Sequence, residues 1–350
     1  MLTPDPLESA AREALSPESF AYIAGGSGDE VTLRANTAAW RAYALRPHVL
    51  RDVVETDLTT TVVGTPLAAP IGIAPTAMHK LVHQDGELAT ARAAAAAGAL
   101  MTVSMFANHS YADVAEAMDG APFWAQMYLL RDHGLTRELA VRAKEAGARA
   151  LVVCVDGAAV PRRSRFAGGA FVPPKGLAFP NVREIGLTKA ITGLDRAMTF
   201  DDLTLFPEWT GLPIVVKGVQ RGDDAARCAA AGAAGIVVSN HGARQFDGCT
   251  PTAAVLGEIV DAVAGNAEVY VDGGIRSGSD GVKALALGAR AVFAGRPPLW
   301  ALAAHGEAGA TAWLHDFAED IARVLAFCGC RTPGEATRDL VARAWPPPHG

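Results

Sequence analysis

The stretch LPIVVKGVQRGDDAARCAAAGAAGIVVSNHG, residues 212–242, decides the fold. It opens with an apolar run of strand length and continues through DDAARCAAAG, an alanine-rich segment that ends on a glycine suited to a helix C-cap. It then returns to a second apolar run, GIVVSNHG. A strand, a helix and a second strand in this order predict two parallel strands joined by a crossover helix.

The same unit recurs along most of the chain. Helical segments of similar composition lie at 86–98 and 136–147, and each ends on a glycine. Eight strand-helix units close into a barrel, so we predict an α/β fold of the (β/α)8 TIM-barrel type. An open doubly wound sheet is the alternative, but no GxGxxG phosphate turn opens the first unit. The eight apolar runs begin at Pro70, Leu100, Phe123, Ala150, Leu212, Gly235, Glu268 and Ala291.

We predict a single domain over residues 1–350. Residues 1–60 are expected to form an N-terminal helical cap, in which FAYIAGGSGDE (20–30) ends one helix at Gly25 and Gly26. The barrel is expected at 61–330 and a C-terminal tail at 331–350. The Gly- and Pro-rich stretch 162–199, after the fourth strand, is far longer than an ordinary loop and predicts a flap.

Composition excludes several classes of protein. With 350 residues, 50% of them hydrophobic, the chain can bury a large core. A balance of 31 Lys+Arg against 37 Asp+Glu offers no general attraction to nucleic acid or to anionic membranes. The five cysteines lack CxxC spacing, which predicts reduced thiols and no metal site. The N-terminus resembles no signal peptide, and the longest apolar run is shorter than the roughly 20 residues of a membrane span. We therefore expect a soluble, cytoplasmic protein.

Polar residues follow the predicted strands. In a barrel, side chains at the carboxyl ends of the strands surround the active site. A single lysine there is usually solvated, and a single histidine is usually a satisfied core group. Polar residues at the ends of most of the strands, taken together, predict a site. The residues at these ends are Thr76, Ser104, Gln126, Tyr128, Asp156, Lys217, Ser239, His241, Asp272, Gly295 and Arg296.

Three short motifs indicate the chemistry. In SNHGARQFDG (239–248), the imidazole of His241 can take a proton and the guanidinium of Arg244 can hold a carboxylate in a two-point fork. This pair predicts an enzyme acting on a small organic acid. DGGIRSG (272–278) and AGRP (294–297) supply glycine N–H groups and arginines where barrels commonly bind phosphate. They could be ordinary tight turns, but as a pair they predict a phosphorylated cofactor or substrate.

Together these motifs resemble a known family, the FMN-dependent α-hydroxy acid oxidases and dehydrogenases, which include glycolate oxidase, lactate oxidase and mandelate dehydrogenase. The resemblance runs from about residue 22 to about residue 330. The matching motifs are APTAM (74–78), QMY (126–128), VKGV (216–219), SNHGARQFDG, DGGIRSG, KALALGA (283–289) and GRP (295–297).

The resemblance implies a non-covalently bound FMN. Lys217 would lie at the pyrimidine end of the ring, where negative charge gathers on reduction, and the phosphate would lie near Arg276, Gly295 and Arg296. The implied cofactor-binding residues are Thr76, Ala77, Ser104, Gln126, Cys154, Lys217, Ser239, Asp272, Gly274, Arg276, Gly295 and Arg296.

The resemblance also implies roles at the substrate. His241 would take a proton, and Asp156 would pair with the imidazolium that forms. Arg163 and Arg244 would hold the carboxylate, and Tyr22 and Tyr128 would add hydroxyl contacts. These roles leave open whether a hydride moves together with the proton or a carbanion forms first. Expressed by role, the catalytic residues are His241, Asp156 and Tyr128, and the substrate-binding residues are Tyr22, Phe106, Tyr128, Arg163 and Arg244.

The chain departs from the family pattern in one segment. Many relatives read Thr, any residue, Asp, Thr, Pro, whereas residues 154–158 read CVDGA, and Pro161 replaces a glycine before two arginines. Cys154 therefore removes a threonine hydroxyl that would contact the flavin. The flap looks shorter than in glycolate oxidase and lacks the membrane-binding insertion of the mandelate dehydrogenases.

These observations predict an FMN-dependent oxidase that converts an (S)-2-hydroxy acid and oxygen to a 2-oxo acid and hydrogen peroxide. Phe106 lies about where glycolate oxidase carries a bulkier tryptophan, so we expect a mandelate-like aromatic substrate. In similar enzymes an alanine at the place of Ala77 accompanies the use of oxygen, so the resemblance favours oxygen as acceptor. The alternatives are a dehydrogenase with another acceptor, a lactate or glycolate oxidase, a phosphate-binding barrel such as type 2 isopentenyl diphosphate isomerase, and a non-catalytic flavoprotein. We expect a homo-oligomer, a tetramer or octamer, with no nucleic-acid or membrane partner.

Overall fold

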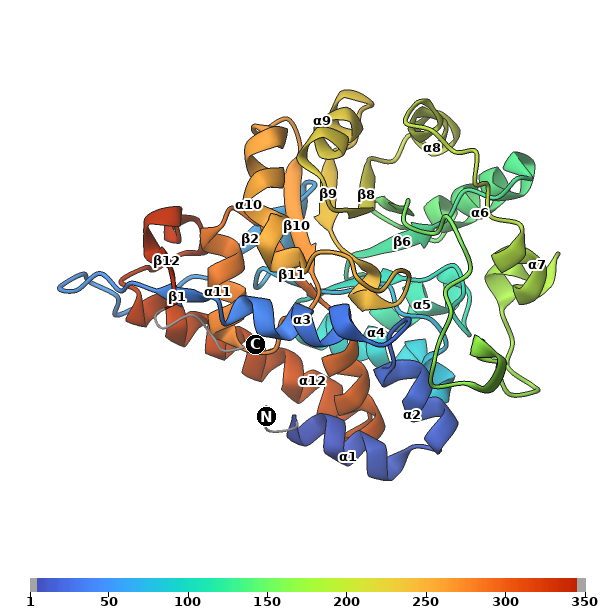
Figure 1. Cartoon of the computed structure of the whole chain (residues 1–350), viewed down its shortest axis with the longest axis horizontal. Helices are drawn as coiled ribbons and strands as arrows, with labels where there is room; N and C mark the ends of the chain where they lie inside the picture. Colours follow the sequence, from blue (N-terminus) through green and yellow to red (C-terminus); the bar gives the residue numbers. More distant parts are fainter. Residues whose placement is uncertain (1–4, 345–350) are drawn as a thin grey trace.

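The computed structural model describes residues 5–344, and its centre is a closed barrel of eight parallel strands (Figure 1). All eight apolar runs form the strands predicted for them, which confirms the TIM barrel. Around the barrel the strand order is β10-β11-β4-β5-β6-β7-β8-β9. The strands are β4 (Ile71–Ile73), β5 (Leu100–Val103), β6 (Phe123–Met127), β7 (Leu151–Cys154), β8 (Ile214–Val219), β9 (Gly235–Val238), β10 (Glu268–Asp272) and β11 (Ala291–Ala294).

Helices surround the barrel (Figure 1). The predicted ends of three helices at glycines are confirmed. Gly98, Gly147 and Gly232 follow their helices with φ of 60°, 96° and 91°, a backbone region that residues with a side chain disfavour. The helices after the strands are α4 (Glu87–Ala96), α5 (Tyr111–Met118), α6 (His133–Glu145), α8 (Leu205–Thr210), α9 (Gly222–Ala230), α10 (Thr252–Val263), α11 (Gly278–Ala286) and α12 (Arg296–Phe327), which is broken at Gly306.

Aromatic side chains fill the inside of the barrel below the strand ends. Trp124 packs against Tyr270 and Phe293 with ring centroids 5.6 Å and 5.9 Å away. Strand glycines make the room for them, since a Cβ at Gly235 would lie 2.7 Å from the Tyr270 ring. The carboxyl ends of the strands therefore stand on a packed floor rather than on an open pore.

The N-terminal cap contains α1 (Pro6–Ala14), α2 (Pro17–Ala24) and α3 (Val31–Trp40). As predicted, α2 ends at Gly25, whose N–H donates to Ala21 O. The cap is fixed to the barrel by a reciprocal pair of amides, in which Asn36 Nδ2 donates to Asn240 Oδ1 over 2.9 Å and Asn240 Nδ2 donates to Asn36 Oδ1 over 2.7 Å.

Strands also occur at the two ends of the chain, where the sequence predicted only a helical cap and a tail. A hairpin of β2 (Thr60–Val62) and β3 (Thr65–Leu67) precedes the barrel, and β1 (Tyr43–Leu45) pairs antiparallel with β12 (Val341–Arg343). The predicted tail, 331–350, lies outside the described residues beyond position 344. Three-residue strands carry too short an alternating pattern to be recognised in sequence.

The predicted flap follows β7 and includes α7 (Gly186–Thr192) with the short 3-10 helices η2 (Ala167–Gly169) and η3 (Pro180–Val182). Backbone bonds tie down both of its ends. Gly28 N donates to Arg162 O over 3.0 Å, and Asp195 N donates to Leu129 O over 2.8 Å. Within residues 5–344, no helix is both long enough and apolar enough to cross a membrane.

Candidate active site

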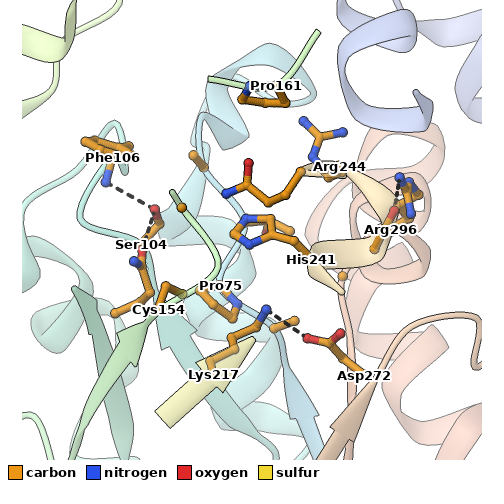
Figure 2. A pocket seen from close by; sticks show the side chains of 18 of the residues that line it. Pro75, Ser104, Phe106, Cys154, Pro161, Lys217, His241, Arg244, Asp272 and Arg296 are labelled. Atoms are coloured by element: carbon orange, nitrogen blue, oxygen red, sulfur yellow. Dashed lines mark hydrogen bonds and ion pairs between the residues drawn. The ribbon is translucent and has the colours of Figure 1, made fainter. Parts of the chain in front are cut away.

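A cavity of about 220 Å3 lies at the carboxyl ends of the strands, under the cap and the flap (Figure 2). Two predicted residues, Asp156 and Ser239, do not line it but stand directly behind His241 and Lys217. The predicted residues that line the cavity are Tyr22, Thr76, Ala77, Ser104, Phe106, Gln126, Tyr128, Cys154, Arg163, Lys217, His241, Arg244, Asp272, Gly274, Arg276, Gly295 and Arg296.

His241 and Asp156 form a hydrogen-bonded pair. His241 Nδ1 lies 3.1 Å from both carboxylate oxygens of Asp156. The left-handed turn at His241 and Gly242, with φ of 57° and 60°, sets the direction of the imidazole. Gly218 allows Asp156 to approach, because a Cβ there would lie 2.7 Å from the carboxylate carbon.

This pair is arranged for proton transfer. Burial would raise the pKa of Asp156, but the charge of His241 and its hydrogen bond outweigh burial and hold that pKa below its ordinary value. A charged carboxylate accepts the Nδ1–H of His241, which leaves Nε2 as an acceptor on a ring that lines the cavity. His241 is therefore placed to act as a base.

Lys217 provides a buried positive charge at the end of β8. Its Nζ donates to Ser239 Oγ over 2.8 Å and lies 3.1 Å from Asp272 Oδ2 (Figure 2), and Ser239 Oγ in turn donates to Asp272 Oδ1 over 2.7 Å. Burial would lower the pKa of Lys217, but the neighbouring charges, that of Asp272 above all, raise it overall. Lys217 therefore stays cationic in the cavity wall.

Two further arginines of the cavity wall, Arg276 and Arg296, have no counter-ion within residues 5–344. Arg296 uses its guanidinium to donate to backbone carbonyls, at 3.0 Å to Ile23 O and 2.9 Å to Gly242 O. Arg276 lies over the ring of Trp300, 5.1 Å from its centroid. Burial lowers the pKa of both arginines, and neither forms an ion pair with any residue in 5–344. Buried cations of this kind are stabilised by a bound anion.

A second cationic pair faces the middle of the cavity. The ring of Tyr22 lies beside both Arg163 and Arg244, whose guanidinium carbons are 5.4 Å and 4.8 Å from its centroid. Arg244 Nη1 donates to Tyr22 O over 2.7 Å, while buried Arg163 Nη1 has no partner among the described residues. Burial, followed by the charge of Arg244, lowers the pKa of Arg163 to about 10. Free, desolvated guanidinium donors suit a carboxylate.

Tyr128 and Cys154 keep their protons. Burial above all, with the neighbouring charge of Asp156 in addition, raises the pKa of Tyr128, and burial raises the pKa of Cys154 to about 12. Possible ligand atoms of Cys154, Asp156 and His241 lie within 4.8 Å of one another. A metal would need the thiolate form of Cys154, which burial disfavours. Tyr128, whose ring stacks on Phe106 at 5.8 Å, is a hydroxyl donor.

The cavity fits a cofactor with a polar ring at one end and a phosphate at the other. The side-chain carbonyl of Gln126 accepts from Ser104 Oγ over 3.2 Å, which leaves its buried Nε2 without a partner among the described residues. Lys217, Arg276 and Arg296 line this same cavity, and the two arginines have no ion-pair partner within residues 5–344. FMN has this distribution of polar groups and charge.

Sequence reasoning missed several residues of the site. His79 Nε2 lies 2.6 Å from Thr76 Oγ1 and its Nδ1 lies 2.9 Å from Thr90 Oγ1, so it positions Thr76 from behind. His79 directly follows the motif APTAM (74–78), and this position was the only available signal. Leu194 and Arg196 line the cavity from the flap, and no periodic pattern marks a loop residue that folds back over a barrel.

A family model described as FMN-dependent dehydrogenase matches residues 11–343. The chain belongs to this family. Glycolate oxidase 3 of Arabidopsis thaliana is 41% identical and is aligned over 98% of this chain and 96% of its own. L-lactate oxidase of a Nostoc species is 44% identical and is aligned over 92% of this chain and 93% of its own. A crystal structure of mandelate oxidase with (S)-2-phenylpropionate superimposes with a TM-score of 0.89 at 40% identity, covering 97% of each chain.

Membership in the FMN-dependent dehydrogenase family confirms the predicted cofactor and the predicted class of reaction, the oxidation of a 2-hydroxy acid. A solved mandelate oxidase containing a C4a-OH-FMN adduct superimposes with a TM-score of 0.90 at 40% identity. The fold, the cofactor and the reaction class therefore agree with the chemistry of the cavity.

Proposed function

We propose that the protein oxidises (S)-2-hydroxy acids to 2-oxo acids and uses oxygen as the final acceptor, with release of hydrogen peroxide. The observation that carries this proposal is the His241–Asp156 pair, with Nδ1–Oδ distances of 3.1 Å, in one cavity with Arg163 and Arg244. FMN, when bound, supplies the two-electron acceptor for the oxidation. The substrate loses two protons and two electrons, and oxygen takes up the two protons and the two electrons to form hydrogen peroxide.

In this proposal the residues of the chain bind the acid and move one proton. Arg163 and Arg244 hold the carboxylate, because both line the cavity beside the ring of Tyr22 and carry guanidinium donors. His241 takes a proton from the substrate at Nε2, and the carboxylate of Asp156 stabilises the imidazolium. The hydroxyl of Tyr128 donates a hydrogen bond to the substrate, and Tyr22 packs beside both arginines.

The proposed cofactor contacts divide between the two ends of the cavity. Ser104, Gln126 and Lys217 line the cavity where the ring would be held, and Ser239 supports Lys217 from behind. The charge of Lys217 favours the added electrons. Thr76, Ala77 and Cys154 complete the wall. The backbone at Gly274 and Gly295, with the side chains of Arg276 and Arg296, would hold the phosphate. Asp272 holds Lys217 in place, 3.1 Å away.

We infer that aromatic acids of the mandelate type are better substrates than glycolate. Phe106 stacks on Tyr128 at a centroid distance of 5.8 Å and offers an aromatic face to the cavity, and the structural relatives include mandelate oxidase. A small-acid oxidase is the second candidate, because glycolate oxidase and L-lactate oxidase are among the curated relatives. Ala77 supports oxygen, rather than another carrier, as acceptor.

A substrate panel tests the function. Purified protein should be yellow and should bleach when mixed anaerobically with (S)-mandelate, (S)-lactate or glycolate, and air should restore the colour with release of hydrogen peroxide. We expect the highest kcat/KM with mandelate. A higher value with lactate or glycolate would select the small-acid alternative, and slow reoxidation by oxygen would select a dehydrogenase.

A histidine variant tests the chemistry within the same assay. His241→Ala should slow bleaching by about 100- to 10,000-fold, the usual cost of losing a general base, while the substrate still binds. The matched control is His48→Ala, which removes a histidine from an exposed pair whose Nε2 lies 3.1 Å from Asp339. Bleaching of the His241 variant at the rate of the control would remove His241 from the mechanism.

The remaining parts of the proposal concern assembly and location. We infer a homo-oligomer, a tetramer or octamer, because the loop between β1 and β2 exposes Val49, Leu50 and Val54, 77%, 103% and 91% accessible in this chain. Light scattering after size-exclusion chromatography measures the oligomeric state.

A cytoplasmic location is supported by five free cysteines, four of them buried.

A further inference from the structure

A second cavity, of about 430 Å3, adjoins the active site. It lies between the flap and the turn from β8 to α9, and none of the proposed roles uses it. The two cavities share five of their lining residues, namely Tyr128, Cys154, Gly157, Leu194 and Arg196. The two spaces are therefore neighbours with a common wall.

Gly157 contributes no side chain to this common wall. A Cβ at Gly157 would lie 3.1 Å from Tyr128 Cε1 and 3.2 Å from Leu194 Cδ1, closer than ordinary van der Waals contact. The Tyr128 ring and the end of Leu194 therefore pack directly against the backbone of Gly157. Residue 157 also belongs to the segment that departs from the family pattern.

Leu194 is the movable part of the wall. Its backbone is fixed, because it forms a bridge with Leu130 and because Asp195 N donates to Leu129 O over 2.8 Å. A leucine side chain can change rotamer without any backbone movement. Rotation of the Leu194 side chain therefore changes this part of the wall while the flap backbone stays in place.

The lining of the second cavity changes from inside to outside. The inner wall is apolar and includes Leu129, Leu203 and Val219, all of them buried. The outer rim is polar and exposed. There Arg221 is paired with Asp223 at 2.7 Å, whereas Arg196 has no ion-pair partner among the described residues.

We propose that the second cavity is a substrate subsite that binds the apolar extension of a 2-hydroxy acid whose side chain is longer than a single aromatic ring. This inference rests on the proposed function. Ligand sites are mostly apolar clefts of about 300 to 1,000 Å3, and an apolar cavity of about 150 Å3 already binds benzene. A space of about 430 Å3 therefore accommodates an alkyl chain or a second ring, with its far end at the polar rim.

A homologous series of unbranched (S)-2-hydroxy acids, from four to ten carbons, tests the subsite through kcat/KM. Beyond the length that fills the first cavity, we expect the value to rise about fourfold per methylene until the second cavity is filled. A value that stays flat or falls beyond four carbons would overturn the subsite while leaving the proposed function intact. If no acid of any length is oxidised, the proposed function and the subsite both fail.

Two variants fill the second cavity from the side away from the active site. Met198→Trp should lower kcat/KM for the eight- and ten-carbon acids at least tenfold and leave the four-carbon acid within twofold. Thr199→Trp, at an exposed position on the same rim, should act in the same direction if the Met198 variant folds poorly. Thr188→Trp is the control, because Thr188 is exposed on the flap and lines neither cavity. An equal loss for short and long acids would refute the subsite.

Discussion

Replacing Asp156 by asparagine isolates the charge behind the proposed base. Asparagine keeps the size of the side chain but removes the charge from a group that lies 3.1 Å from His241 Nδ1 and is only 13% exposed. A hydrogen bond to a charged group contributes about 1.5–3 kcal/mol. If all of it stabilises the imidazolium at the transition state, Asp156→Asn should slow the chemical step by about 10- to 150-fold.

A second effect of the Asp156→Asn substitution also slows the chemical step. The amide of asparagine can donate to Nδ1 and so favour the tautomer that carries its proton on Nε2, which cannot accept another. We therefore treat tenfold as the lower limit. The assay is anaerobic stopped-flow bleaching of FMN at saturating substrate. The dissociation constant of the substrate is taken from the dependence of the bleaching rate on substrate concentration. Asp339→Asn, in the exposed pair with His48, is the control. A rate within threefold of wild type would refute the reasoning.

The same variant makes a prediction about pH. The pKa of Asp156 is lowered in the folded protein from its ordinary 3.8, so its stabilising effect is present above pH 3.8 and is lost as the pH falls through the folded value. The difference in free energy of unfolding between wild type and Asp156→Asn should therefore shrink below pH 3.8. Urea unfolding between pH 6 and pH 3 measures it, and a difference that grows on acidification would contradict the assigned sign.

Three further variants test the rest of the site. Arg244→Lys should raise the dissociation constant of the acid, because an ammonium cannot reproduce the guanidinium fork; an unchanged constant would assign the carboxylate elsewhere. Arg276→Ala combined with Arg296→Ala should weaken FMN retention on dialysis, since two charged phosphate contacts disappear, and full retention would place the phosphate away from both. Lys217→Met should lower the free energy of unfolding by about 3–5 kcal/mol, because it leaves the carboxylate of Asp272 buried and unpaired. Urea unfolding of the apoprotein tests this, and a loss below 1 kcal/mol would contradict it.

The sequence by itself determined the barrel and most of the residues that line the cavity. Apolar runs, alanine-rich helices and terminal glycines are local signals, readable within about 30 residues, as in 212–242. The fold places every strand end at one rim, so residues such as Lys217 and His241 were assigned to one site from their position alone. Their chemical types then indicated an acid substrate and a phosphorylated cofactor.

Tertiary structure alone decided which of these residues touch. Tyr22 meets Arg163 and Arg244 because the cap folds over the barrel, and the Asn36–Asn240 pair that fixes it joins residues 204 positions apart. Leu194 enters the wall of both cavities through a flap without periodic pattern. Hydrophobic periodicity records which face of an element is buried, but it carries no information about the partner that buries it. Contacts between distant segments depend on the packing of the whole chain, and the second cavity arises from such contacts.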